Sequence, residues 1–181
     1  MAAQATTPAR FWARFLWGPL TAAGLIMAVA IAIADQALKL WLLFGFDLGS
    51  KGRVPLTPFL DLILIWNKGI SYGLFQQDSA FGQWALFSVK IIAVALLWIW
   101  LARAETRLTA VALGLIVGGA VGNAIDQVLH GAVADFVLLH LTTASWSFRW
   151  YVFNLADVAI VAGVAALLYE SLLAGRAAKA P

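Results

Sequence analysis

The sequence predicts an all-α integral membrane protein with four transmembrane helices, a small extracytoplasmic β-sheet and a short interfacial helix. Of its 181 residues, 63% are hydrophobic and 12% are charged, and the mean hydropathy is +0.89. Too little polar surface remains to coat a soluble domain of this size. Four apolar stretches reach the length of about 20 residues that crosses a bilayer. The nine Trp residues are typical of membrane interfaces.

The four predicted spans account for most of the apolar residues. They cover residues 20–44, 84–102, 108–127 and 153–173, and they leave loops at 45–83 and 128–152. No internal repeat, low-complexity tract or long linker divides the chain. We therefore expect residues 1–181 to form a single membrane-embedded domain.

The basic residues predict which side of the membrane each loop faces. One group flanks the ends of the spans on the side of the termini, and it consists of Arg10, Arg14, Arg103, Arg107, Arg176 and Lys179. A smaller group lies in the two other loops and consists of Lys51, Arg53, Lys68 and Arg149. Because Lys and Arg are enriched on the cytoplasmic side, this distribution favours cytoplasmic termini and outward-facing loops at 45–83 and 128–152.

A cleaved signal peptide is an alternative interpretation of the N-terminus. Arg10 and Arg14 precede an apolar run, and residues 32–34, Ala-Ile-Ala, resemble a cleavage site before Asp35. The apolar run continues to Phe44, which is long for a signal peptide and favours a retained span.

The residue pattern of the first outer loop, 45–83, predicts most of the small sheet. Pro55 and Pro58 bound a strand, an apolar run covers 59–66, and the glycines after it mark turns. We expect the interfacial helix near 74–81. In the second outer loop, the apolar residues after Asp135 predict a strand and the aromatic residues of 146–153 an interfacial anchor.

The carboxylates are the most informative polar residues, because charge in or beside a bilayer is costly and is retained mainly for pairing, transport or catalysis. Asp35, Asp126, Asp135 and Asp157 fall at the outward ends of the spans. Asp126 lies roughly 27 Å along its span from the inner face, and Asp157 lies about one turn inside the fourth span. Carboxylates from different segments can therefore meet at one depth.

The pattern Asn-x-x-Asp occurs twice, at Asn123–Asp126 and at Asn154–Asp157. The spacing puts each amide on the same helix face as its carboxylate, so each Asn can orient its Asp by hydrogen bonding. Alternatively, these residues cap helix ends and join neighbouring spans. Spacing alone leaves the partner of Asp157 ambiguous between Asp126 and Asp135.

Two lysines lie within the predicted spans. Lys39 follows Asp35 by four residues, a spacing suited to a buried ion pair. Lys90 has no acidic residue three or four positions away, and the sequence explains it only as a snorkelling side chain. Small residues that allow close helix packing gather in the third span, at Gly114, Gly118, Gly119 and Gly122.

Composition argues against a metal, a cofactor or nucleic acid as a ligand. The chain has no Cys, and its two histidines, His130 and His140, are not spaced as a helical metal motif. The basic residues are scattered and form no stripe along which a phosphate backbone could lie. Ser71 and Ser145 lie in no nucleophile pattern.

Five segments in order resemble the signature blocks of bacterial lipoprotein signal peptidases, also called type II or prolipoprotein signal peptidases. They are Asp35-Gln-Ala-Leu-Lys39, Asn67-Lys-Gly69-Ile-Ser-Tyr-Gly73, Gly118-Gly-Ala-Val-Gly122-Asn123-Ala-Ile-Asp126, Val133-Ala-Asp135-Phe136 and Phe153-Asn154-Leu-Ala-Asp157. A single block would carry little weight, but together they cover residues 35–157 and agree with the four predicted spans.

The resemblance implies an intramembrane aspartyl endopeptidase that removes the signal peptide from diacylglyceryl-modified prolipoproteins, cutting before the lipidated cysteine. It implies Asp135 and Asp157 as the catalytic pair. It also implies a set of substrate-binding or supporting residues, namely Asp35, Lys39, Asn67, Gly69, Asn123, Asp126 and Asn154. The expected protein is a monomer in the bacterial inner membrane that contacts membrane lipids and has its active site at the periplasmic face.

One position departs from the family pattern. The family usually has Arg after the Asp of the third block, where this chain has Gln127. Arg149 is one candidate to supply the missing positive charge near Asp126.

A small proton-coupled transporter or channel is the alternative function, because intramembrane acids also serve as proton relays. Such a protein would spread its polar residues through the bilayer, whereas these acids gather at one boundary. Two close, partly desolvated carboxylates share one proton, which is the state that peptide hydrolysis requires.

Overall fold

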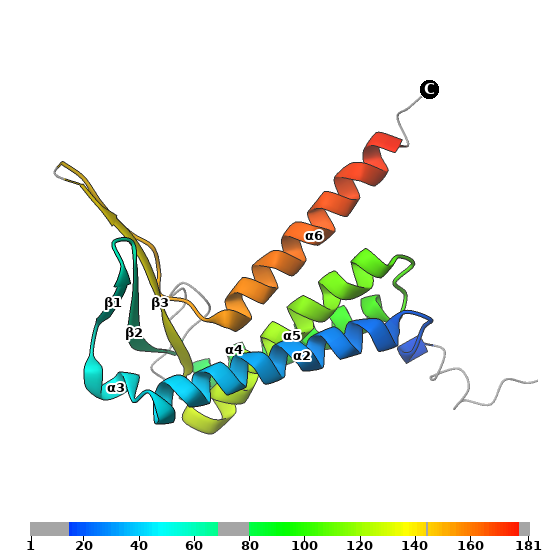
Figure 1. The fold of residues 1–181 in the computed structure, drawn as a ribbon. Coiled ribbons are helices and arrows are strands. Elements are labelled where there is room, and N and C mark those ends of the chain that lie inside the picture. The colour runs from blue at the N-terminus through cyan, green and yellow to red at the C-terminus, as the bar shows by residue number, and fades with distance from the viewer. Residues whose placement is uncertain (1–14, 69–79, 144, 178–181) are drawn as a thin grey trace, which may run out of the picture.

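The computed structural model describes residues 15–68, 80–143 and 145–177, and it confirms the predicted fold class. Among these residues, four helices are long and apolar enough to cross a membrane. They are α2 (Thr21–Leu40), α4 (Ala80–Leu101), α5 (Arg107–His130) and α6 (Leu155–Ala177). The sheet lies at one end of the helices, and the two ends of the described chain lie toward the other (Figure 1).

The central helix is α5, which packs against both α2 and α6. Small residues of α5 allow this close packing, as the sequence predicted, and they face two neighbouring helices. Gly118 and Gly122 lie against α2, and a Cβ atom at Gly122 would come within 2.7 Å of Oδ2 of Asp35. Gly119 lies on the other side, against the backbone oxygen of Ala156 in α6. The three backbones are therefore close enough for short polar side chains to bridge them.

The end of α5 lies beyond the predicted span. The helix continues to His130, and the next residue, Gly131, adopts a left-handed conformation with φ 70°. Its amide donates a hydrogen bond to the carbonyl oxygen of Gln127 at 3.0 Å. Glycine adopts this conformation without strain, so Gly131 ends the helix and turns the chain directly into the sheet.

The sheet has four antiparallel strands in the order β1-β2-β3-β4. From α2 the chain passes through a π-helical turn, η1 (Trp41–Gly45), and a short helix, α3 (Leu48–Lys51). The strands are β1 (Val54–Thr57), β2 (Leu60–Asn67), β3 (Val133–Thr142) and β4 (Ser147–Arg149). A cluster of Leu42, Leu48 and Phe136 packs the sheet onto the end of α2.

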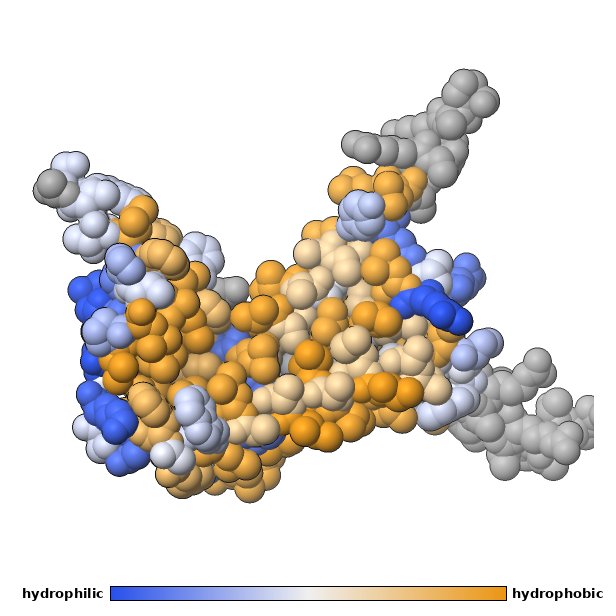
Figure 2. All heavy atoms as spheres, in the orientation of Figure 1, coloured by the Kyte–Doolittle hydropathy of each residue, from blue (hydrophilic) through white to orange (hydrophobic). Residues whose placement is uncertain are grey.

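The surface agrees with a membrane environment. Hydrophobic residues cover the sides of the helices, and hydrophilic residues gather at the sheet and at the opposite ends of the helices (Figure 2). The interfacial helix predicted near 74–81 falls mostly within residues 69–79, which lie outside the described residues. The predicted turns at Gly69 and Gly73 lie there as well.

Candidate active site

Asp135 reaches the site from β3. In the register between β2 and β3, Ile65 pairs with Asp135 and Asn67 pairs with Val133. Asn67 therefore lies on the strand next to Asp135, two residues along from the partner of Asp135. Nδ2 of Asn67 donates to Oδ2 of Asp135 at 3.0 Å, and Nδ2 of Asn154 donates to Oδ1 at 2.6 Å. The Asp135 residue is only 2% exposed. The sheet thus places the buried carboxylate of Asp135 at the ends of the helices.

Asp157 reaches the same place from the first turn of α6. The amide nitrogen of Asp157 donates to Oδ1 of Asn154 at 3.0 Å, and the amide nitrogen of Asn154 donates to Oδ2 of Asp157 at 3.2 Å. This reciprocal arrangement is a capping box. Nδ2 of Asn123 in α5 donates to the other oxygen, Oδ1, at 3.0 Å. Capping and site formation, which the sequence presented as alternatives, both occur at Asn154.

Asn154 connects the two aspartates. Its Nδ2 contacts Asp135 and also Oδ1 of Asn123 at 3.0 Å, while its backbone nitrogen and Oδ1 contact Asp157. The residue is fully buried. One residue therefore contacts both carboxylates, Asp135 through its side chain and Asp157 through its backbone nitrogen, which makes Asp135 the neighbour of Asp157.

The surroundings of Asp135 favour its protonated form. Burial, and after it the negative charge of Asp157, raise the pKa of Asp135 to about 7, while the hydrogen bonds from Asn67 and Asn154 act in the opposite direction. Near neutral pH, Asp135 can therefore hold a proton beside a second carboxylate.

Lys39 lies beneath the pair and is almost fully buried. Its Nζ contacts Oδ2 of Asp35 at 2.8 Å, Oδ2 of Asp126 at 2.8 Å and Oδ1 of Asn123 at 3.0 Å. The predicted ion pair with Asp35 is thus present, and Asp126 completes a buried triad. Because an ammonium group only donates, it fixes Oδ1 of Asn123 toward Lys39 and therefore turns Nδ2 toward Asp157.

Asp126 differs from what the Asn-x-x-Asp pattern suggested. The interpretation that Asn123 orients Asp126 was wrong, because Asn123 crosses instead to Asp157. Asp126 is held by Lys39, by Nε2 of Gln36 at 2.9 Å and by the amide nitrogen of Ala134 at 3.0 Å. Gln36 was missed as a site residue. Its only sequence signal was its position inside the first signature segment, between two recognised residues.

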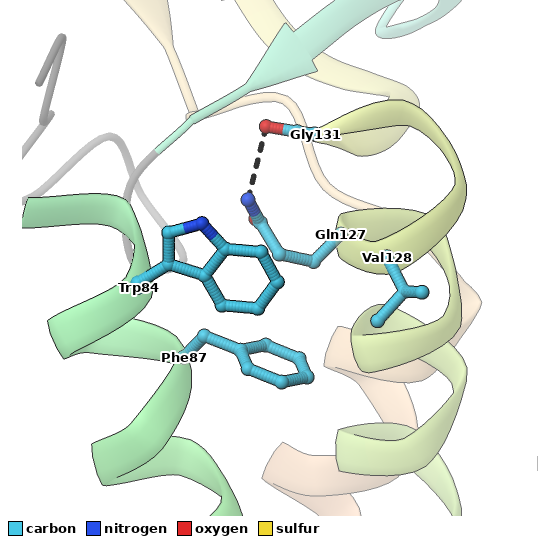
Figure 3. A pocket seen from close by; sticks show the side chains of 5 residues that line it. All are labelled: Trp84, Phe87, Gln127, Val128 and Gly131. Carbon is cyan, nitrogen blue, oxygen red and sulfur yellow. Dashed lines mark hydrogen bonds between the residues drawn. The ribbon is translucent and has the colours of Figure 1, made fainter. Parts of the chain in front are cut away.

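Gln127 does not take part in this network. Its Nε2 donates to the carbonyl oxygen of Gly131 at 2.9 Å, at the end of α5 (Figure 3). It lines a small cavity of about 160 Å³ together with Trp84, Phe87, Val128 and Gly131. Arg149, the candidate replacement for the family's usual Arg, is an exposed residue of β4 opposite His140. The cation that contacts Asp126 is Lys39.

A groove leads from the outside of α6 to Asp157. It has a volume of about 350 Å³ and lies where the molecule is hollowed between the sheet and α6 (Figure 2). Its walls are apolar apart from the carboxylate, and they consist of Leu139, Trp150, Phe153, Asp157, Val158, Val161, Ala162 and Ala165. An apolar chain can reach Asp157 along this groove without leaving an apolar surface.

The model of one protein family, described as signal peptidase (SPase) II, matches residues 27–173. The chain belongs to the signal peptidase II family. It is therefore a peptidase of the bacterial membrane, and it is not the transporter or channel of the alternative interpretation. Every described residue that the resemblance implied lies in the network above; Gly69 is outside the described residues.

Individual relatives agree with this assignment. The chain is 62% identical over 158 residues to a lipoprotein signal peptidase of Nitrobacter hamburgensis, and this alignment covers 87% of this chain and 96% of the relative. It is 56% identical over 149 residues to one of Methylorubrum extorquens, covering 82% and 85%. A bacterial membrane enzyme solved by the in meso method at 2.3 Å superposes with a TM-score of 0.69 at 26% identity, covering 88% of this chain and 92% of that chain.

Proposed function

We propose that this member of the signal peptidase II family removes the signal peptide from prolipoproteins that carry a diacylglyceryl-cysteine. It cuts before the lipidated cysteine, and Asp135 and Asp157 form the catalytic pair. The single observation that supports this most is the contact of Asn154 with both carboxylates, because it places two buried acids from separate segments side by side.

The contacts divide the two roles between the aspartates. Asp157 accepts hydrogen bonds from Asn123 and from the backbone of Asn154, which hold its two oxygens in place. Asp135 has a pKa raised to about 7 and carries the shared proton. Asp157 is thus the general base and Asp135 the general acid.

The reaction proceeds in two steps. Asp157 takes a proton from water as the water oxygen bonds to the carbonyl carbon of the scissile peptide, and Asp135 gives its proton to the carbonyl oxygen. The tetrahedral intermediate then collapses. The C–N bond breaks, the leaving nitrogen takes the proton held by Asp157, and the hydroxyl proton returns to Asp135. Both carboxyl groups end in their starting states.

The substrate class agrees with the groove. A signal peptide is apolar and helical, and a diacylglyceryl group carries two acyl chains. Both can lie against the apolar wall formed by α6 while the peptide bond beside the cysteine reaches Asp157. The relatives named above are lipoprotein signal peptidases, which supports the same substrate class.

We further propose that residues 1–181 act as a single-domain monomer in the bacterial inner membrane, surrounded by membrane lipids, with cytoplasmic termini and the active site at the periplasmic face. A reporter enzyme fused after Lys179 should then be active only in the cytoplasm. Activity of a periplasm-dependent reporter at this position would contradict the orientation.

The central experiment offers the purified protein one precursor in two forms, with and without the diacylglyceryl group on its cysteine. Mass spectrometry should find the cut immediately before the lipidated cysteine, with the unlipidated form left intact. The products should be unchanged in EDTA, since two carboxylates suffice for the proposed chemistry. Equal cleavage of both forms would contradict the substrate assignment, and loss of activity in EDTA that zinc restores would contradict the mechanism.

A further inference from the structure

Lys90 lies on the packed side of α4. Less exposed positions recur along this helix every three or four residues and include Phe87, Lys90, Val94, Leu97 and Leu101. Residues with this spacing share one helix face. Leu101 is fully buried against Ala110 and Leu113 of α5. A charged residue therefore occupies the face of α4 that packs against α5.

The packing of α4 on α5 places Lys90 at the level of the catalytic pair. The two helices are antiparallel, joined by a short turn. Near one end, Trp84 and Phe87 face Gln127 and Val128 across the cavity (Figure 3). Lys90 lies about one turn further into the membrane than Phe87, and the residue one turn further in than Gln127 is Asn123.

The hydrogen bond that positions Asp157, the proposed general base, lies at this level of the membrane. Nδ2 of Asn123 donates to Asp157. Asp157 and then Asp135 are the groups whose charges act on the Lys90 ammonium. Of these two carboxylates, Asp157 is the one that Asn123 contacts at this level.

The other charged groups around the pair are already engaged with one another. Asp35 and Lys39 approach from α2 and Asp126 from α5, and the two carboxylates share the Lys39 ammonium. Among the described residues, Lys90 is the charged group that α4 brings to this level. Placing an ammonium within a span is costly, and a Met side chain of similar length would fill the same space without that cost.

We propose that Lys90 is a positioning residue of the catalytic pair, and that its positive charge favours the ionised form of Asp157 and thereby keeps the shared proton on Asp135. This inference rests on the proposed function, because it takes Asp135 and Asp157 as the pair. Lys90 touches neither the water nor the peptide in this role. It acts through the electrostatic potential at the base.

The test compares Lys90→Met, which removes the charge, with Lys90→Arg, which keeps it. Lys51→Met is the matched control, because Lys51 is an exposed lysine of α3 whose ammonium lies over the ring of Phe46, 5.2 Å from its centroid. Two quantities are measured in detergent: the pH dependence of kcat/KM, and the titration of the ¹³C-labelled carboxyl groups of the pair by NMR. Signals are assigned with Asp135→Asn and Asp157→Asn.

In Lys90→Met, the acidic limb of the pH profile and the lower titration step of the pair should move to higher pH by roughly half a unit to one unit. Lys90→Arg and Lys51→Met should match the unchanged protein. The thermal midpoint of Lys90→Met should not fall, because a costly buried charge is removed. If it does fall, Lys90→Gln provides the same comparison in a folded protein.

Superimposable titrations in the unchanged protein and Lys90→Met would overturn the role of Lys90, whatever the activity. If the carboxyl titration shifts as expected but Asp135→Asn and Asp157→Asn both retain full turnover, the proposed function is wrong and the electrostatic contact stands. A merely structural role would change the thermal midpoint and leave both titrations in place.

Discussion

The two Asn-x-x-Asp segments are the same motif at the same depth, yet the structure uses them differently. In α5, Asp126 contacts the Lys39 ammonium, Gln36 and the amide of Ala134, which together bind both of its oxygens. In α6, Asp157 is held by Asn123 and by the backbone of Asn154. Lys39 thus contacts the first carboxylate, and amide groups of Asn123 and Asn154 contact the second.

The difference separates an acid bound in an ion pair from an acid that lies beside a second carboxyl group. Asp126 is held in an ion pair with Lys39, whereas Asp157 is held by amides next to Asp135. Lys39 lies one turn after Asp35 in α2. Its position determines that Asp126 forms an ion pair with its ammonium group.

The largest expected effect comes from removing either acid of the pair. Asp135→Asn and Asp157→Asn should each lower turnover at least 10²–10⁴-fold, because they remove acid–base function and almost no volume. Both variants should remain folded in detergent. The rate of precursor cleavage and the thermal midpoint are measured on the same samples. Full activity in Asp157→Asn would remove the distinction between the two segments, and full activity in either variant would contradict the proposed pair.

Asp126→Asn should act through stability. The change leaves Lys39 with a single carboxylate and breaks a buried ion pair, which costs about 3–5 kcal/mol. The thermal midpoint should fall, while the molecules that remain folded keep measurable turnover. A folded and inactive Asp126→Asn beside an active Asp135→Asn would show that these two residues exchange roles.

The pH dependence of stability should reveal Asp135. Its pKa in the folded protein, about 7, is above the ordinary 3.8. The folded state thus binds this proton more tightly than the unfolded state, and the resulting stability is fully present below pH 3.8 and lost as pH rises through about 7. Asp135→Asn cannot ionise. Its thermal midpoint relative to the unchanged protein should therefore rise between pH 4 and pH 8, by up to the equivalent of about 4 kcal/mol.

The pH dependence of the activity should also reflect the ionisation of Asp135. Above pH 7, kcat/KM should fall about tenfold per pH unit as Asp135 loses the proton that it gives to the carbonyl oxygen. A flat midpoint difference together with a flat alkaline limb would show that Asp135 is ionised throughout, and it would exclude it as the acid.

Asn123→Ala should give a smaller effect, because it removes the hydrogen bond to the charged oxygen of Asp157, together with the oxygen that accepts from Lys39 and Asn154. Such a bond contributes about 1.5–3 kcal/mol, so turnover should fall roughly 10–100-fold. Gln127→Ala is the matched control on the same helix, since the side chain of Gln127 donates its hydrogen bond to the carbonyl oxygen of Gly131, away from the pair. Equal rates for the two variants would mean that Asn123 does not position Asp157.

Local sequence was sufficient for the membrane character, the four spans and the short-range contacts. The apolar stretches predict the helices because a bilayer requires satisfied backbone groups and apolar side chains over a fixed length. The four-residue spacing of Asp35 and Lys39 predicts their ion pair, and Asn154 with Asp157 forms a cap within one turn. In each case the partners are joined by a few residues of one helix, so the geometry follows from helix periodicity.

The tertiary structure decided which distant residues meet. The sequence could not place Asn123 beside Asp157 or Gln36 beside Asp126, because these contacts depend on how close and at what rotation α2 and α6 pack against α5. The register of β2 and β3 brings Asn67 to Asp135, and a slip of one residue would turn Asp135 to the other face of the sheet. The sequence by itself supplied the four acids and their depth, and packing sorted them into two bound to Lys39 and two that can share a proton.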